Sequence, residues 1–166
     1  MIAGMTPMRI VSIYISPKSN YWRRPKAQPG DAPIESPQSV ECHAEHGLVG
    51  DRFYDYKENY KGQVTFMHYE TLMALKKVTG KDFSLEVFRR NVILSGPKIM
   101  QLQGKKFQFG DVIFEGTEHC TPCHWMDFAA GDGAYAWLDK NTAGGLRARI
   151  LQSGHISLGN EVVILG

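Results

Sequence analysis

Glu115-Gly-Thr-Glu-His-Cys-Thr-Pro-Cys-His-Trp-Met-Asp127 is the stretch around which the rest of the chain is organised. It separates Cys120 from Cys123 by two residues and places His119 and His124 beside them. A strand-like segment precedes it and a Gly/Ala-rich turn follows it. Soft, ionisable side chains at a strand end indicate a chemical site. These residues leave three kinds of chemistry open: metal binding, thiol–disulfide exchange, or a thiolate that holds a cofactor.

The totals are those of an ordinary globular domain. A chain of 166 residues with 43% hydrophobic and 22% charged residues predicts one domain with a real core. A net charge of +2 gives no argument for nucleic acid, and the basic residues Arg23, Arg24 and Lys26 fit a solvated loop. No apolar run reaches the ~20 residues that span a bilayer. An odd number of cysteines argues against a secreted disulfide framework, so we expect a cytoplasmic protein.

Short strands dominate the predicted secondary structure. Strands are expected over 9–16, 39–44, 63–68, 90–95, 107–116 (a pair or one bent strand), 146–152 and at the end of 154–165, after a turn. Helices are expected over 69–79, ended by Gly80, over a short segment up to Phe88 capped by Asp82 or Ser84, and over 133–140. Residues 47–52 are expected to form a turn, 1–8 a flexible tail and 17–37 a long Pro-rich loop. This pattern predicts a mostly β, β-rich α+β domain of β-barrel-like form.

The cysteine pair has several alternative interpretations. Cys-x-x-Cys is half of a tetrahedral zinc site, which Cys42 or His46 would have to complete. The chain has no second such pair, so structural zinc is the minor alternative. A dithiol oxidoreductase normally has this motif between a strand and a helix, and the residues around Cys123 lack that βαβ context. Two small buried hydrophobes are the remaining interpretation, which the neighbouring histidines and acids disfavour.

Arginines recur beside glycine-rich turns and other polar positions. The residues concerned are Arg52 after Gly50-Asp51, Arg89 and Arg90 before Asn91, and Arg147 after Gly144-Gly145. A guanidinium group binds phosphate or carboxylate through two parallel hydrogen bonds, and glycine lets the backbone approach such a ligand closely. The alternative is that each arginine pairs with a structural acid such as Asp51, Glu86 or Glu161.

The order of the motifs resembles that of the MOSC domain family, which is named for the C-terminal domain of molybdenum cofactor sulfurase. The segments that carry the resemblance are Gly47-Leu-Val-Gly-Asp-Arg52, Gln63-Val64, Arg89-Arg-Asn-Val-Ile93, Gly96, Leu102-x-Gly104, Phe109-Gly-Asp111, Cys120-Thr-Pro-Cys123, Gly144-Gly-Leu-Arg-Ala-Arg-Ile150 and Gly154-His-Ile-Ser-Leu-Gly159. They extend from about Arg9 to Leu165, and the chain looks like the stand-alone bacterial type.

The resemblance implies a barrel-like fold and a pyranopterin molybdenum cofactor. It implies Cys123 as the ligand of molybdenum, with Cys120 as the alternative. Arg52, Arg89, Arg90 and Arg147, with Asp51 and Asn91 orienting their neighbours, would bind the rest of the cofactor. The implied activity is reduction of N–O bonds in N-hydroxylated small molecules, with an electron-donor protein as partner, or transfer of sulfur or cofactor through a loop cysteine. A non-catalytic sulfur carrier or a structural-zinc module is the alternative function.

Overall fold

The computed structural model describes residues 6–18 and 32–166. The predicted tail and Pro-rich loop fall partly outside these residues, and Arg23, Arg24 and Lys26 lie wholly outside them. In chain order the elements are β1 Arg9–Ile13, β2 Ser39–His43, β3 Gly47–Leu48, β4 Val64–His68, α1 Tyr69–Thr79, the 3-10 helix η1 Leu85–Phe88, β5 Val92–Ser95, the 3-10 helix η2 Ile99–Leu102, β6 Lys106–Phe109, β7 Val112–His119, α2 Trp125–Ala130, α3 Ala134–Lys140, β8 Leu146–Gln152, β9 Gly154–Ser157 and β10 Val163–Ile164.

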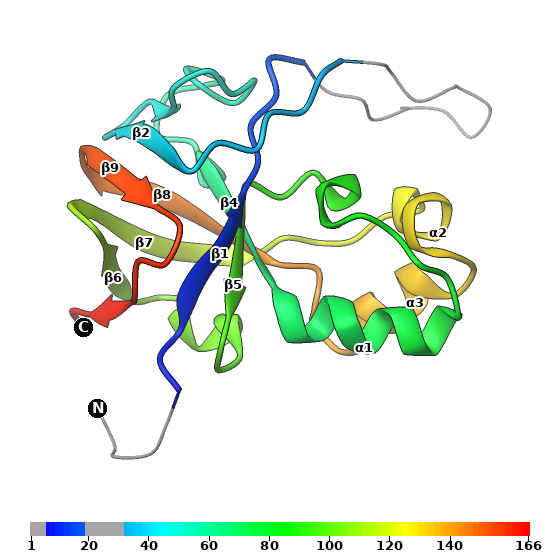
Figure 1. Ribbon diagram of the computed structural model, residues 1–166. Helices are drawn as coiled ribbons and strands as arrows, with labels where there is room; N and C mark the ends of the chain where they lie inside the picture. The colour runs from blue at the N-terminus through cyan, green and yellow to red at the C-terminus, as the bar shows by residue number, and fades with distance from the viewer. Residues whose placement is uncertain (1–5, 19–31) are drawn as a thin grey trace.

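A curled sheet forms the body of the molecule (Figure 1). Its seven strands follow the order β1-β5-β4-β8-β7-β6-β10, in which only the neighbours β4 and β5 run parallel. The residues just before β10 return to the opposite edge, where Ile10 N–H donates to Asn160 O (3.0 Å) and Val162 N–H donates to Met8 O (2.9 Å). The C-terminal segment therefore joins the two edges of the sheet, which confirms the predicted barrel-like, β-rich α+β fold.

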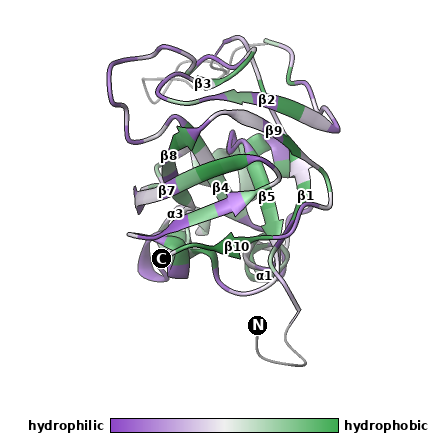
Figure 2. Ribbon diagram, turned by 90° about the vertical axis from the view of Figure 1, so that its left-hand side faces the viewer, coloured by the Kyte–Doolittle hydropathy of each residue, from purple (hydrophilic) through white to green (hydrophobic). Residues whose placement is uncertain are grey.

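A smaller sheet of order β3-β2-β9 lies beside the curled sheet, and the three α-helices gather on its other side (Figure 1). Phenylalanines from β4, β6 and β7 fill the inside of the curl, and a second apolar cluster lies between the sheet and the helices. Figure 2 shows the hydrophobic segments concentrated on strands such as β5, β7 and β10. None of the helices among the described residues has the length and apolar character that crossing a membrane requires.

Two elements match the sequence prediction at both ends. Helix α1 covers 69–79, and Gly80 ends it in the left-handed conformation with φ 70°, its N–H donating to Lys76 O. Strand β8 covers 146–152 and buries Leu146, Ala148 and Ile150 while the arginines between them face outward. Local periodicity determined both, because each has one apolar face and a clear stop signal.

Other expectations were wrong in detail. The segment after Cys123 begins with helix α2 instead of a turn, and neither Asp82 nor Ser84 caps η1 through its side chain. Gly47–Leu48 forms the short strand β3, and the C-terminal segment holds two strands where one was expected. By contrast, the 107–116 segment is a strand pair, one of its two expected forms, turned at Gly110 with φ 55°. The strands β3, β9 and β10 are short, and β9 and β10 are determined by pairing with distant strands, which no local pattern encodes.

Candidate functional site

A cavity of about 200 Å³ brings four separate parts of the chain together. They are the connection from β3 to β4, the residues before β5, the cysteine loop between β7 and α2, and the start of β8. The lining residues are Arg52, Phe53, Tyr60, Gly62, Thr65, Arg89, Arg90, Cys120, Thr121, Cys123, Met126 and Arg147. The wall thus carries two thiols and four guanidinium groups, and no carboxylate. We call it the inner cavity.

The cysteine loop is bound to the residues just before β8. Cys120 N–H donates to Gly145 O (2.8 Å), and residues 120–123 belong to no helix, strand, turn or bend. Helix α2 follows Cys123, contrary to the sequence prediction. The two thiols of the loop form no disulfide. Cys120 is buried and Cys123 is partly exposed.

Gly144 fixes the position of this loop. A Cβ atom at Gly144 would lie 2.2 Å from Cys120 O and 2.8 Å from Pro122 Cδ, so only glycine fits. Gly144 N–H donates to His119 Nε2 (2.9 Å), and Arg90 Nε donates to Gly144 O (2.9 Å). Because Nε2 accepts a hydrogen bond, His119 is neutral with its proton on Nδ1. Burial, together with repulsion from Arg90, lowers the pKa of His119 and favours this form, while Asp139 acts in the opposite direction.

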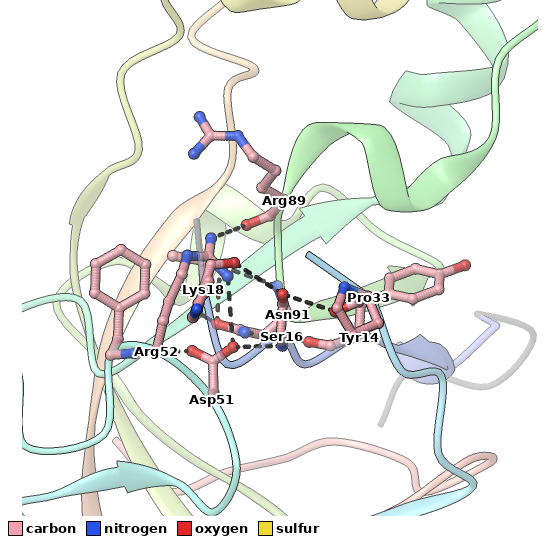
Figure 3. A network of polar contacts seen from close by, with 10 residues as sticks. Tyr14, Ser16, Lys18, Pro33, Asp51, Arg52, Arg89 and Asn91 are labelled. Carbon is pink, nitrogen blue, oxygen red and sulfur yellow. Dashed lines mark hydrogen bonds and ion pairs between the residues drawn. The ribbon is translucent and has the colours of Figure 1, made fainter. Parts of the chain in front are cut away.

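Arg52 reaches the cavity from a loop that Asp51 anchors (Figure 3). The Asp51 carboxylate accepts hydrogen bonds from Ser16 N–H (3.1 Å) and Phe53 N–H (3.2 Å), and it lies 3.5 Å from Arg52 Nη1. Arg52 Nη2 donates to Arg89 O (3.4 Å). Within the described residues, the buried Arg52 Nε has no hydrogen-bond partner. The Arg52 side chain therefore carries one buried hydrogen-bond donor that the described residues leave unsatisfied.

The Arg52 guanidinium group is buried, which is energetically unfavourable for its positive charge. Burial lowers the pKa of Arg52, attraction to Asp51 opposes this, and repulsion from Arg90 adds to the lowering. Arg89, in the left-handed region with φ 57°, lies with its guanidinium carbon 5.1 Å from the centre of the Trp125 ring. Clustered buried guanidinium groups repel one another, and an anion placed between them relieves that repulsion.

Asn91 joins the strands beneath the cavity. Its Oδ1 accepts from Thr65 N–H (3.0 Å) and Thr65 Oγ1 (3.1 Å), and its Nδ2 donates to Tyr14 O (3.2 Å). Asn91 is 2% exposed, so these bonds satisfy a buried amide. Neither Asp51 nor Asn91 lines the inner cavity. Their contacts position Arg52 and Thr65, which do line it.

Arg147 and Cys120 both line the inner cavity, and Cys120 affects the pKa of Arg147. Arg147 Nη1 donates to Glu118 Oε1 (3.1 Å). Burial lowers the pKa of Arg147, but the electrostatic influence of Cys120, Tyr60 and Glu118 together outweighs burial, so the pKa is raised. Tyr60, which the sequence reading did not select, lines the cavity beside them, and burial raises the pKa of its hydroxyl.

Residues 48–163 match the family model of the MOSC domain, which is well over half of the chain. The chain belongs to the MOSC domain family. Its fold is similar to that of the YuaD protein from Bacillus subtilis, with a TM-score of 0.72 and 14% identity over 95% of this chain and 94% of that one. It is also similar to YiiM from Geobacillus stearothermophilus, with a TM-score of 0.68 and 17% identity over 96% of this chain and 76% of that one. YiiM from Escherichia coli gives a TM-score of 0.65 and 14% identity over 96% of this chain and 71% of that one. No curated protein matches the chain with significant similarity.

The MOSC fold gathers most of the predicted site residues and adds others. Both loop cysteines and the four arginines meet at the inner cavity, while Asp51 and Asn91 lie behind its wall. Sequence reasoning missed Phe53, Tyr60, Gly62, Thr65 and Met126. The only signal for Tyr60 was a cluster of aromatic residues in 53–60, which single-sequence reasoning cannot separate from ordinary packing.

The described residues of this MOSC domain offer no set of zinc ligands. Across residues 6–18 and 32–166, no group of three or more His, Cys, Asp or Glu side chains is arranged to hold a metal ion. Cys42, the proposed third ligand, lies on β2 with no exposed surface. Burial, with a smaller effect of Glu41, raises the pKa of its thiol to about 12. A thiol that resists deprotonation this strongly is a poor zinc ligand.

Proposed function

We propose that this MOSC protein binds the pyranopterin molybdenum cofactor in the inner cavity and catalyses the reduction of N–O bonds in N-hydroxylated small molecules. The observation that carries the proposal is the wall of that cavity. It combines two thiols with four guanidinium groups and no carboxylate. That combination suits a ligand with a soft metal at one end and a phosphate at the other.

The residues present fit such a group. A cysteine thiolate is a soft ligand for a high-valent metal, and guanidinium groups bind phosphate through paired hydrogen bonds. Arg52 Nε, buried without a partner in the described part of the chain, is a donor that an anionic ligand would satisfy. We assign the metal to Cys123, because it is partly exposed, whereas Cys120 is buried against Arg147. When bound, the cofactor supplies the two-electron chemistry.

The protein's own residues would orient the substrate and manage its charge. Reduction of a hydroxylamine-type group consumes two electrons and two protons and gives an amine and water. The positive charge of Arg147, at the cavity wall, stabilises negative charge on the departing oxygen. His119 and Gly144 hold the cysteine loop in place while this occurs. The two electrons would be supplied by an electron-donor protein.

Metal and pterin analysis tests the proposal. The protein is purified from a host that makes molybdenum cofactor, beside the variants Cys123→Ser, Cys120→Ser and Arg147→Ala, with Cys42→Ser as the control away from the cavity. We expect near-stoichiometric molybdenum and pterin in the parent and in the Cys42→Ser protein, and little molybdenum in Cys123→Ser. Turnover of N-hydroxylated bases and amidoximes should follow the molybdenum content.

Other results would change the function. Wild-type molybdenum in both the Cys120→Ser and the Cys123→Ser protein would remove the cysteines from the site. A persulfide on one cysteine, in protein without molybdenum or reductase turnover, would favour the sulfur-carrier alternative. Zinc at one equivalent per chain would favour a structural metal and contradict the cavity assignment.

A further inference from the structure

Two residues of the inner cavity also border a second, larger hollow. This outer groove has a volume of about 540 Å³. Its lining residues are Lys57, Glu58, Asn59, Tyr60, Lys61, Glu118, Arg147 and Arg149. Tyr60 and Arg147 are the two residues common to both linings. They therefore stand at the boundary between the sulfur-lined cavity and the groove, and we call them the collar residues.

Both collar side chains are braced. The Tyr60 ring packs against Tyr56, with 4.9 Å between the ring centres, and against Phe53, at 5.8 Å. A Cβ atom at Gly62 would lie 3.2 Å from Tyr60 Cζ and 3.3 Å from Arg147 Cδ, so the two side chains close in on this glycine from both directions. The hydrogen bond to Glu118 fixes the guanidinium group of Arg147. Because both side chains are held in place, we expect them to limit the size of a molecule that passes between the two hollows.

The outer groove differs in chemistry from the inner cavity. Beyond the collar its wall is polar, with the positive charges of Lys57, Lys61 and Arg149 beside the negative charges of Glu58 and Glu118. Hydrogen-bonding groups of either charge find partners on such a wall. A molecule that reacts at the thiols and extends through the collar can therefore bind there through a hydrophilic group at its far end.

We propose that Tyr60 and Arg147 form a collar that admits substrates by width, and that the outer groove binds the hydrophilic distal part of the substrate. The substrate class is then a slim N-hydroxylated compound with a polar or charged group away from the reacting nitrogen. The substrate class rests on the proposed function. The collar is a property of the apo protein and can be measured without any reaction.

Thiol labelling of the apo protein measures the collar directly. Rates of modification at Cys123 are followed by mass spectrometry with iodoacetamide as the small reagent and a fluorophore-bearing maleimide as the wide one. Tyr60→Ala should raise the rate with the wide reagent by about tenfold, a barrier change of about 1.4 kcal/mol, and leave the rate with iodoacetamide unchanged. Tyr60→Phe should behave as wild type, since the ring and not the hydroxyl sets the width. Tyr54→Ala is the matched control, because Tyr54 lies in the same connection, packs against His43 and His46 instead of Tyr60, and lines neither hollow.

The outcomes separate the collar from the reaction. Equal rates for the wide reagent in wild type and Tyr60→Ala, or an equal gain in Tyr54→Ala, would overturn the collar. If Tyr60→Ala does not fold, Tyr60→Trp replaces it and should slow the wide reagent. If the collar holds and molybdenum is absent, the proposed function alone is wrong. With active protein, Lys57→Ala and Lys61→Ala should raise KM for a negatively charged N-hydroxylated substrate and leave kcat and the KM of a small neutral one unchanged. An equal effect on both substrates would contradict the role of the groove.

Discussion

Replacing Gly144 with alanine tests whether the cysteine loop is held by a single close contact. The added Cβ would lie 2.2 Å from Cys120 O, a backbone atom that no side-chain rotation can move away. The backbone of Gly144 does not lie in the left-handed region, so alanine at this position causes no backbone strain of that kind. The effect of the substitution therefore comes from packing. Relief requires the loop or β8 to move by roughly 1 Å to reach contact distance.

The size of the effect follows from what that movement disturbs. Forcing extra volume into a packed site costs about 1–3 kcal/mol. The shift also weakens the bonds Gly144 N–H to His119 and Arg90 Nε to Gly144 O, each worth about 0.5–1.5 kcal/mol or more for a charged donor. We expect Gly144→Ala to lower the free energy of unfolding by about 2–5 kcal/mol. For a chain of this length the melting temperature should fall by roughly 5–15 °C.

Urea denaturation followed by fluorescence measures the change, and labelling of Cys123 reports whether the loop has moved. Gly62→Ala is the matched control, because the nearest atoms to its Cβ are side-chain atoms of Tyr60 and Arg147 at 3.2–3.3 Å, which would have to move by only a few tenths of an ångström. It should cost less than about 1 kcal/mol. A Gly144→Ala protein as stable as the Gly62→Ala protein, with unchanged labelling of Cys123, would refute the idea that this glycine holds the loop.

Two further substitutions test the supports of the site. The pKa of His119 in the folded protein lies below the ordinary His value of about 6.5. The folded state therefore binds a proton at His119 less readily than the unfolded state does. The stability that His119 contributes is complete above pH ~6.5 and is lost as the pH falls towards the pKa in the folded protein. His119→Gln should flatten this part of a stability–pH curve measured by urea denaturation, and an unchanged slope would show that other groups cause it. Asn91→Ala should cost about 2–4 kcal/mol in urea denaturation, because it strips buried Thr65 and Tyr14 groups of their partners. A cost as small as that of Thr117→Ala, whose hydroxyl bonds Lys61 O at an exposed position, would contradict this reasoning.

Local sequence patterns were sufficient to predict the fold class, helix α1 and strand β8. The alternation in 146–152 and the helical spacing in 69–79 each mark one apolar face, and burial of that face is enough to select the element. The order of the motifs indicated the family, which the match over residues 48–163 confirms. Helix α2 escaped prediction because six residues without a side-chain cap carry too little local signal.

Only the tertiary structure decided which residues share the site. Cys120, Arg52, Arg89 and Arg147 come from segments far apart in the chain, and they meet because β4, β5, β7 and β8 are neighbours in one sheet. The same arrangement sends Asp51 and Asn91 behind the cavity wall and brings Tyr60 to its boundary. Local sequence fixes the residue types that a site can use. The distances between those residues depend on the order and register of the strands. Order and register arise from pairing between segments far apart in the chain, which the local sequence of either segment does not specify.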